Sequence, residues 1–487
     1  MTDSNRLRLT TVRETTFGTT PGTPRMRTAR LTGESIAYEP QFVQSEEIRA
    51  DRMNSDPIKV NEINQGAINF ELSYPVDNSP LSDFIRSLFF NTWVSTPTFD
   101  NDGTADSVIE DAGTTADTYQ VASGGAAVVA GHLVRATGFT NAANNQIFRA
   151  ASSTGTTIVG SSLSLTAETA PPGTAKLKVV GFEGASGDIT AGASGLGSTS
   201  LDFTTLGLAV GQWIKIGGSD TGEQFATSAN NGWARISGTP TATALPLDNL
   251  PSGWSTDSGS SKTIRVWFGD QIKNGTTQTS LTIERGFMGQ TTPTYLIQRG
   301  MVAGEGEINF TTEEVITGSV TFQGLTGEQT TTSLDASPDA ATTNAIMSAN
   351  VNVGRIAESG AALASPNYVR SAQIRVNNNL RTITAVGSVG AVDIGEGEAR
   401  VEGTLETYFG SNALLAKLLA ATVGSINLRA QKDSQAIILA VPRATFTSGS
   451  PSAGGKNQDV QLPLGFMASK DADTSAHVIM DRLEYYE

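Results

Sequence analysis

The sequence predicts a mainly β protein, and its composition and patterning carry this prediction. Gly accounts for 51 of the 487 residues, and Thr, Ser, Ala and Asn fill the gaps between short apolar runs. The hydrophobic share of 38% is enough to build cores, whereas charged residues make up only 17%. Short alternating runs between turn residues are typical of strands rather than long amphipathic helices. The chain is too long for one compact domain.

Net charge and the supply of reactive side chains exclude several classes of function. The chain has a net charge of −15 and no basic stripe, so we exclude a groove that grips DNA. It contains no Cys, which excludes disulfides, thiolate metal sites and a Cys nucleophile. Two histidines, His132 and His477, are too few to favour a zinc site or a Ser-His-Asp triad. We therefore expect no enzyme activity, no metal and no cofactor.

The sequence shows no targeting signal or membrane helix, so we expect a protein that is made and assembled in a cytoplasm, without a membrane partner. Residues 1–6 lack the apolar core of a signal peptide. The longest apolar runs, such as residues 436–441, fall far short of the roughly 20 residues that a membrane helix needs.

The first part of the chain predicts a strand followed by a helix. Residues 66–74 alternate with period two, as a half-buried strand does. Ser79 is a suitable N-cap for the following helix, and Pro80 suits its first position. One face of this helix collects the apolar residues Leu81, Phe84, Ile85, Leu88 and Phe89.

The last part of the chain repeats this order. Residues 397–408 form the strand, and the helix starts near Asn412 and ends around Gly424. Three later pairs of strand-like runs also correspond: 280–285 with 425–429, 295–297 with 436–439, and 319–323 with 461–464. The sequence therefore predicts two tandem units that each contain strands and one flanking helix.

A Gly- and Ser-rich segment, residues 98–270, interrupts the first unit just after its helix. Three strand-like runs recur within it: 129–135 with 210–216, 146–149 with 232–235, and 175–181 with 263–269. This recurrence predicts an inserted pair of small all-β modules. The predicted division is 1–97 and 271–335 for the first unit, 98–190 and 191–270 for the modules, and 336–487 for the second unit.

Particular residues connect the two units with a known family. Residues 35–40 lead into the charged run 45–52, and Gly66, the 70–74 strand and its helix follow. In the second unit, residues 374–380 read as a hairpin of a kind that is common in the same family. In these features the units, about two thirds of the chain, resemble the tail tube (major tail) proteins of long, non-contractile-tailed bacteriophages, the siphophage type. The resemblance implies β-sandwiches with a flanking helix. Their inner sheets would close into a barrel within each ring, and stacked rings would conduct genomic DNA.

The resemblance also implies an assembly and its partners. Most members carry one tube unit and form hexamers, so a chain with two units implies trimeric rings with pseudo-sixfold symmetry. Ring closure removes exposed sheet edges. The expected partners are a tape-measure protein, a tail tip complex and a terminator, in a virion tail assembled in the cytoplasm of a bacterial host. The inserted modules would be an immunoglobulin-like decoration on the surface of the tube.

Alternation assigns one face of each unit's strand to the channel. A conduit for DNA must not bind it, and a neutral to acidic lining repels the polyanion. The lumen-facing candidates are the polar residues of the two strands: Asn69, Glu71, Ser73, Arg400, Glu402, Thr404 and Glu406. An ordinary solvated sheet face is the alternative for these residues.

A long polar connection, residues 45–64, is expected to reach the adjacent ring. Its inter-ring candidates are charged: Glu46, Glu47, Arg49, Asp51 and Arg52. A mobile surface loop is the alternative. The N-terminal segment, residues 6–24, would serve the same inter-ring role.

Two rival functions remain open for this sequence. A carbohydrate-binding tail fibre or adhesin needs exposed aromatic clusters, which the tryptophans of the central segment could supply: Trp213, Trp233, Trp254 and Trp267. A glycan-cleaving virion enzyme needs two facing carboxylates in a cleft. The run 304–307, Gly-Glu-Gly-Glu, is not expected to bind a nucleotide, because acidic residues stand where phosphate would lie.

Overall fold

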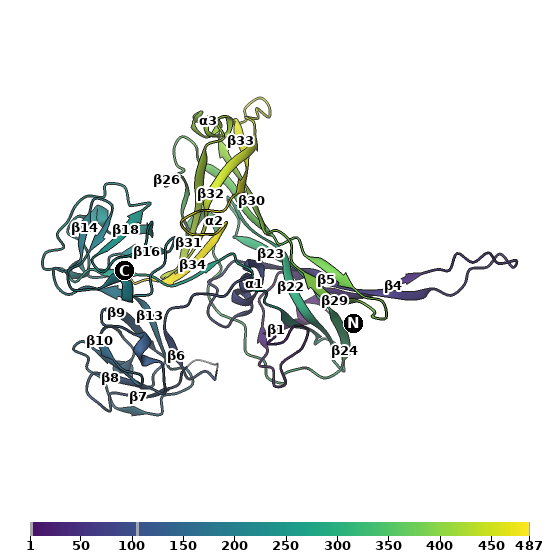
Figure 1. Ribbon diagram of the computed structural model, residues 1–487, viewed down its shortest axis with the longest axis horizontal. Helices are drawn as coiled ribbons and strands as arrows, with labels where there is room; N and C mark the ends of the chain where they lie inside the picture. Colours follow the sequence, from purple (N-terminus) through teal and green to yellow (C-terminus); the bar gives the residue numbers. More distant parts are fainter. Residues whose placement is uncertain (1–2, 104–106, 487) are drawn as a thin grey trace.

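The computed structural model describes residues 3–103 and 107–486, and most of its strands belong to two large antiparallel networks. We call residues 3–97 with 271–335 unit 1, residues 336–486 unit 2, and the residues between 98 and 270 the insert. Figure 1 shows the insert at the left, unit 2 at the top in green and yellow, and unit 1 at the lower right. Strands of units 1 and 2 form one network, and strands of the insert form the other. The mainly β fold predicted from the sequence is confirmed.

One sheet runs through both units, and we call it the shared sheet. Its strand order is β4–β5–β23–β22–β27–β30–β33–β32, and all neighbours are antiparallel. Unit 1 contributes β4 (Ala37–Val43), β5 (Ile58–Glu71), β22 (Thr294–Thr311) and β23 (Thr317–Gln323). Unit 2 contributes β27 (Val369–Asn377), β30 (Arg400–Tyr408), β32 (Gln435–Gly449) and β33 (Gln461–Ala468).

A second layer repeats the same pairing in each unit. In unit 1, the first part of β22 pairs with β21 and β24, and β21 pairs with β1. In unit 2, the first part of β32 pairs with β31 and β34, and β31 pairs with β25. The predicted tandem duplication is therefore confirmed. These outer strands are β1 (Leu7–Arg13), β21 (Leu281–Phe287), β24 (Thr326–Thr330), β25 (Val353–Glu358), β31 (Val423–Lys432) and β34 (Ile479–Glu484).

Short elements complete the two units. They are β2 (Arg27–Thr28), β3 (Gly33–Glu34), β20 (Asp270–Lys273), β26 (Ala361–Ala362), α2 (Ala349–Asn352) and the separate hairpin β28 (Arg381–Thr384) with β29 (Ala391–Gly395). A 3-10 turn, Ser4–Arg6, precedes β1. The N-terminal segment, residues 6–24, was predicted to serve an inter-ring role; it is not a free arm over Leu7–Arg13, and its inter-ring role stays a prediction. Its strand β1 pairs with β21 over its whole length, and Leu9 lies in the main core.

Helix α1 (Pro80–Phe89) forms where the sequence predicts it. The Ser79 hydroxyl accepts from the Ser82 amide at 3.3 Å, and Phe90 ends the helix in a left-handed conformation. The apolar face of α1 packs on the shared sheet, with Phe84 edge-on to Phe322 of β23 at 5.3 Å between ring centroids. Burying such a side chain fully stabilises the fold by about 1.5–3 kcal/mol.

The helix of unit 2, α3 (Ala413–Leu419), is shorter than predicted. It ends well before Gly424, because Ala421 adopts a left-handed conformation with φ 47° and β31 begins at Val423. Asn412 is its N-cap residue, as expected, although its side chain makes no capping hydrogen bond.

The β4–β5 hairpin forms an arm that projects from the body of the molecule, at the right in Figure 1. The predicted connection, residues 45–64, is too long at its C-terminal end, because β5 already begins at Ile58. The non-strand tip is therefore residues 44–57. At the base of the arm, Gly66 has φ 151°, and a Cβ there would lie 2.4 Å from the Cα of Ile36, so only glycine permits this close crossing.

The insert consists of two similar halves joined edge to edge. In the first half, β9 pairs with β10 and β13; in the second, β16 pairs with β17 and β19, and β13 pairs with β19 across the middle. These strands contain the runs whose recurrence the sequence shows. The Asn145 amide bonds both backbone groups of Phe139, and the Asn231 amide bonds those of Phe225 in the same way.

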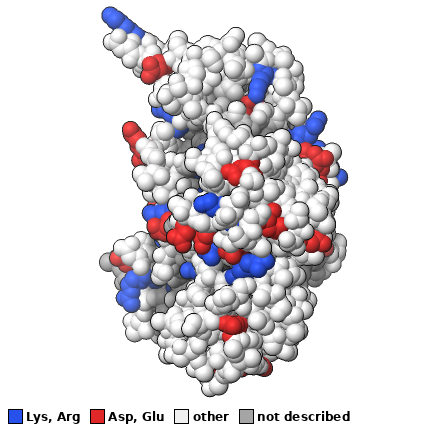
Figure 2. Space-filling view, turned by 90° about the vertical axis from the view of Figure 1, so that its left-hand side faces the viewer, with Lys and Arg blue, Asp and Glu red and all other residues white. Residues whose placement is uncertain are grey.

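The strands of the insert are short. The first half contains β6 (Thr98–Asp100), β7 (Ile109–Ala112), β8 (Thr118–Val121), β9 (His132–Thr137), β10 (Ile147–Ser153), β11 (Thr157–Gly160), β12 (Glu168–Thr169) and β13 (Lys176–Glu183). The second half contains β14 (Thr190–Gly192), β15 (Gly195–Gly197), β16 (Trp213–Ile216), β17 (Trp233–Ile236), β18 (Ala244–Asp248) and β19 (Arg265–Trp267). The 3-10 turns are Gly125–Ala127, Ala142–Asn144, Phe203–Thr205, Thr221–Glu223 and Ser228–Asn230. Figure 2 shows this side of the molecule, where charged side chains gather in a band across an otherwise largely uncharged face.

The insert packs on unit 2, although the chain enters it from unit 1. The strand that leaves the insert, β20, pairs with β34 of unit 2. Trp213, Trp233 and Trp267 of the insert form one buried cluster with side chains of unit 2, among them Ala436 and Ile438 of β32. Since Ile437 and Leu439 of β32 point into the main core, the insert covers the outer surface of the outer layer.

A buried ion network joins all three parts. Arg482 of β34 in unit 2 bonds Asp270 of β20 at 2.9 Å and also contacts Asp77 of unit 1. Lys178 of the insert lies 3.0 Å from Asp77 and 2.9 Å from Asp270. Burial alone would raise the pKa of Asp77, but Lys178 and Arg482 outweigh this effect and hold that pKa well below its usual range.

Candidate functional site

The shared sheet has one continuous polar face, which crosses the boundary between the units. Following the register from β5 to β33, Asn69 stands opposite Ser319, Ser319 opposite Glu307, Glu307 opposite Arg375, Arg375 opposite Glu402, and Glu402 opposite Met467. Directly opposed residues in antiparallel strands point to the same face. The polar sides of the two units therefore form a single surface.

A second row of residues extends the same face. It reads Glu71, Thr317, Asn309, Gln373, Thr404 and Gly465. Arg400 and Glu406 lie on the same side of β30, since they alternate with the buried Val401 and Leu405. Six of the seven lumen-facing candidates thus share this face, whereas Ser73 lies beyond the end of β5 with only 4% of its surface exposed.

Sequence reasoning missed the polar residues that β22 and β27 contribute to this face, including Glu305, Glu307 and Arg375. Their signal was the alternation of residues 304–310, in which Gly304 and Gly306 occupy the opposite side. A Cβ at Gly306 would lie 2.5 Å from the Leu88 side chain, so this glycine lets α1 pack closely. The Gly-Glu-Gly-Glu run is a strand interior and not a phosphate loop.

Carboxylates dominate the charge of the polar face. Arg375 pairs with Glu305, Arg400 pairs with Glu402 at 2.9 Å, and Arg370 lies 3.7 Å from Glu406. Amide and hydroxyl groups bond other glutamates: Gln373 donates to Glu307 at 3.0 Å and Ser371 to Glu406 at 3.2 Å. Each guanidinium is thus matched by a glutamate, and Glu71 and Glu307 remain without a basic partner among the described residues. Exposed pairs of this kind contribute about 0–1 kcal/mol each.

Each outer edge of the shared sheet is unpaired over part or all of its length within the described residues. Between the units, residues 305–311 of β22 pair with β27, and we call this ladder the seam. In unit 2, β31 occupies the corresponding edge of β32 only as far as Thr445. Residues 446–449 of β32 are unpaired on that side, and β4 pairs only with β5. At one end of the shared sheet, β32 occupies the position of β22 and has a free edge; at the other end, β4 occupies the position of β27 and has a free edge.

The inter-ring candidates gather at the tip of the arm. Glu46, Glu47, Arg49, Asp51 and Arg52 are all exposed. Arg49 and Asp51 pair with each other at 2.7 Å, and this hydrogen bond lowers the pKa of Asp51. The side chains of Glu46 and Glu47 have no ion-pair partner within the described part of the chain.

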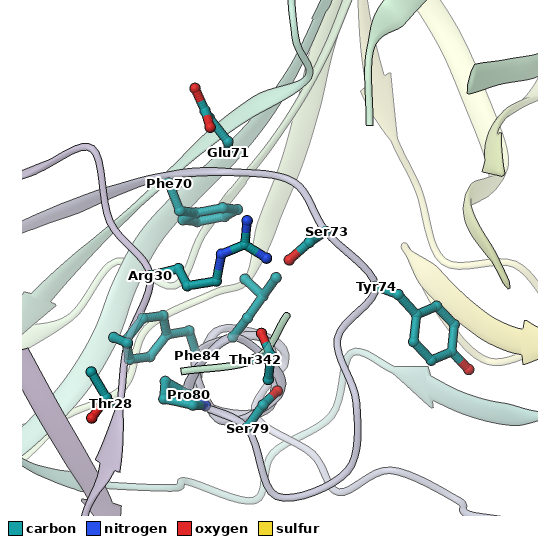
Figure 3. A pocket seen from close by; sticks show the side chains of 12 residues that line it. Thr28, Arg30, Phe70, Glu71, Ser73, Tyr74, Ser79, Pro80, Phe84 and Thr342 are labelled. Carbon is teal, nitrogen blue, oxygen red and sulfur yellow. The ribbon is translucent and has the colours of Figure 1, made fainter. Parts of the chain in front are cut away.

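A small pocket lies beside Glu71. The pocket between α1 and β5 has a volume of about 20 Å³ and holds roughly one water. Figure 3 shows Arg30, Phe70, Ser79, Pro80 and Phe84 around it, while Glu71 points away. Among the described residues, no group of three or more His, Asp or Glu side chains is arranged to hold a metal ion, and no helix is long and apolar enough to span a membrane.

Most of the histidines and tryptophans that the sequence analysis named are buried in the protein. His132 is buried, and its Nδ1 accepts from the Val129 amide at 3.1 Å; burial lowers its pKa to about 4. Trp213, Trp233 and Trp267 expose 1%, 8% and 0% of their surface, so the expectation of an exposed sugar-stacking cluster is wrong for these three. They are buried because the insert packs on unit 2. His477 is half-buried beside β34.

Sequence comparison relates the chain to a known family. A family model described as phage tail tube protein matches the chain twice, over residues 4–262 and over residues 225–468. Together the two matches cover residues 4–468, and they overlap within the insert. No curated protein matches the sequence.

Proposed function

The chain belongs to the phage tail tube protein family, and from this premise we propose that it polymerises into stacked rings that conduct genomic DNA in a siphophage tail. Membership gives it a structural role in the virion tail. The finer proposal is that three chains close each ring with pseudo-sixfold symmetry, and that rings stack into a tube.

The seam between β22 and β27 supports the trimeric ring. Within one chain, this ladder joins two tube units through their inner strands, from Glu305 opposite Asn377 to Thr311 opposite Ser371. The strands that correspond to β22 and β27 at the ends of the shared sheet are β32 and β4, and their outer edges are unpaired. Pairing β32 of one chain with β4 of the next would repeat the seam, and a ring of three chains then has six equivalent junctions. Closure also satisfies the exposed edge amides and carbonyls.

The polar face is the proposed channel lining. The insert covers the outer layer, and α1 and the main core lie behind the shared sheet, so the polar face is the open side of both units. Its unbalanced glutamates repel the DNA backbone, and its arginines are paired with carboxylates rather than free to bind phosphate. DNA would pass without specific binding. The insert would decorate the outside of the tube.

Assembly of the tube would involve three other tail proteins. We propose that a tape-measure protein occupies the channel, that a tail tip complex starts polymerisation, and that a terminator caps the last ring, all in the cytoplasm of the bacterial host. Negative-stain imaging of the purified chain, alone and with its tip complex, tests the proposal. Tubes or rings with a central bore are expected; elongated isolated trimers would instead indicate a fibre.

A further inference from the structure

An arginine-lined cavity lies where unit 1 meets the insert. Its volume is about 520 Å³, and its lining includes Arg13, Arg25, Arg27, Arg86 and Asp83. These side chains come from β1, the segment before and within β2, and α1. Such a concentration of guanidinium groups is notable in a chain with a net charge of −15.

Aspartates pair with every arginine that lines this cavity, Arg482 included, except Arg86, which has no ion-pair partner among the described residues. Asp83 bonds Arg13 at 3.3 Å, and Asp339 serves both Arg25 at 2.8 Å and Arg27 at 3.8 Å. The Arg86 guanidinium has no hydrogen-bond acceptor among the described residues, and its Nε is buried. Burial, together with the neighbouring Arg13, lowers the pKa of Arg86, as expected for a cation with too few counter-charges. The cavity therefore favours an added carboxylate.

The cavity and the arm lie at opposite ends of the same strand. The chain enters β5 from the tip of the arm at Ile58, leaves it at Glu71, and reaches α1 at Pro80. The arm points away from α1 in Figure 1. At about 3.3 Å per residue, the hairpin from Ala37 to its tip extends on the order of 40 Å. Copies stacked along this strand direction would bring the tip of one to the cavity of the next, a head-to-tail contact that generates filaments.

The tip supplies the missing charge. Glu46 and Glu47 are exposed and have no ion-pair partner within the described residues, and the adjacent Ile48 is 99% exposed. We propose that the arginine-lined cavity receives the Glu46–Glu47 carboxylates of a second copy in the adjacent ring. This inference rests on the proposed tube, and it names the site that holds one ring to the next.

The absence of Cys makes a direct test possible. A variant with Ile48→Cys at the tip and Ser95→Cys at the cavity is assembled and treated with a short bismaleimide. Both positions are exposed. Chains joined from ring to ring should give a denaturing-gel ladder that continues beyond three chains. The control pairs Ile48→Cys with Glu110→Cys on the exterior of the insert, and it should give no ladder.

A charge test supplies an independent readout. Glu46→Lys with Glu47→Lys should raise the critical concentration for tube formation at least tenfold at low salt, and less at high salt. The matched pair Glu110→Lys with Asp111→Lys, on β7, should change it less than twofold. If the wild-type chain forms tubes, two results overturn this inference alone. One is equal ladders from the test and control cysteine variants, and the other is an unchanged critical concentration for the Glu46→Lys, Glu47→Lys variant. A wild-type chain that forms no tube with its tip complex refutes the proposed function instead.

Discussion

Glu307 of β22 and Arg375 of β27 stand directly opposite each other across the seam between the two units. Neither forms its ion pair or hydrogen bond with the other: Glu307 accepts from Gln373, and Arg375 pairs with Glu305. The seam is thus held by the backbone ladder and by a zigzag of side chains on its polar face. The same zigzag is what the proposed channel presents to DNA.

The charge of the polar face should control DNA passage. Replacing Glu402 and Glu406 by Lys should alter stability by only about 0.5 kcal/mol, because both are partly exposed. Tubes should assemble, but DNA ejection should slow at low salt, since free cations bind phosphate. High salt should partly restore the rate, because the Debye length is about 10 Å at 0.1 M. The control is Glu110→Lys on the insert. Ejection kinetics unchanged at low salt would mean that these residues do not line the path.

The insert should be held on unit 2 by its buried tryptophans. Trp267 is fully buried, donates to the Gly217 carbonyl at 2.8 Å and contacts Tyr486 edge-on at 5.3 Å. Trp267→Ala should cost about 3–5 kcal/mol and make the insert sensitive to protease. Trp254→Ala, at a partly exposed site within the insert, should cost no more than about 1 kcal/mol. Thermal denaturation and limited proteolysis measure both, and equal effects would contradict the docking role.

Asp481 should make stability depend on pH. Burial raises the pKa of this carboxyl to about 8, although Gln271 donates to it at 3.0 Å. In the unfolded chain its pKa is about 3.9. Because the folded value is raised, the stability from the protonated group is complete below about pH 4 and is lost as pH rises through about 8. Asp481→Asn should therefore raise the melting temperature more at pH 9 than at pH 5.

The size of this effect follows from the same linkage. Each pH unit within the window changes the free energy of unfolding by up to about 1.4 kcal/mol. Asp473→Asn, an exposed site on the preceding loop, is the matched control and should show no such pH dependence. Equal stabilisation by Asp481→Asn at both pH values would show that the carboxyl is already ionised at pH 5.

Local patterns predicted the elements whose signals are contained in a few consecutive residues. Helix α1 formed as expected because Ser79, Pro80 and a periodic apolar face act within three turns. The duplication was visible because the two units repeat their strand order. The end of α3 was misjudged because Ala420 and Ala421, good helix formers by propensity, here end the helix and lead into β31.

Long-range pairing decided the features that the sequence did not reveal. The pairing of β20 with β34 brings Asp270 into contact with Arg482, more than 200 positions later in the chain. No short sequence pattern predicts such a distant contact. The burial of Trp267 follows from that docking, so three of the four tryptophans that suggested an exposed sugar-binding cluster lie in an interface instead. The polar residues of β22 were not predicted to line the polar face, because their role depends on which strands lie beside them.

The number of chains that close one ring tests the account most directly. Gln41→Cys on β4 and Thr447→Cys on β32 place a thiol on each unpaired edge of the shared sheet, and both sites are exposed. Assembled tubes treated with a short bismaleimide should give a denaturing-gel ladder that stops at three chains, because each ring then closes on itself. A ladder that stops at six would contradict the pairing of two tube units per chain in a pseudo-sixfold ring.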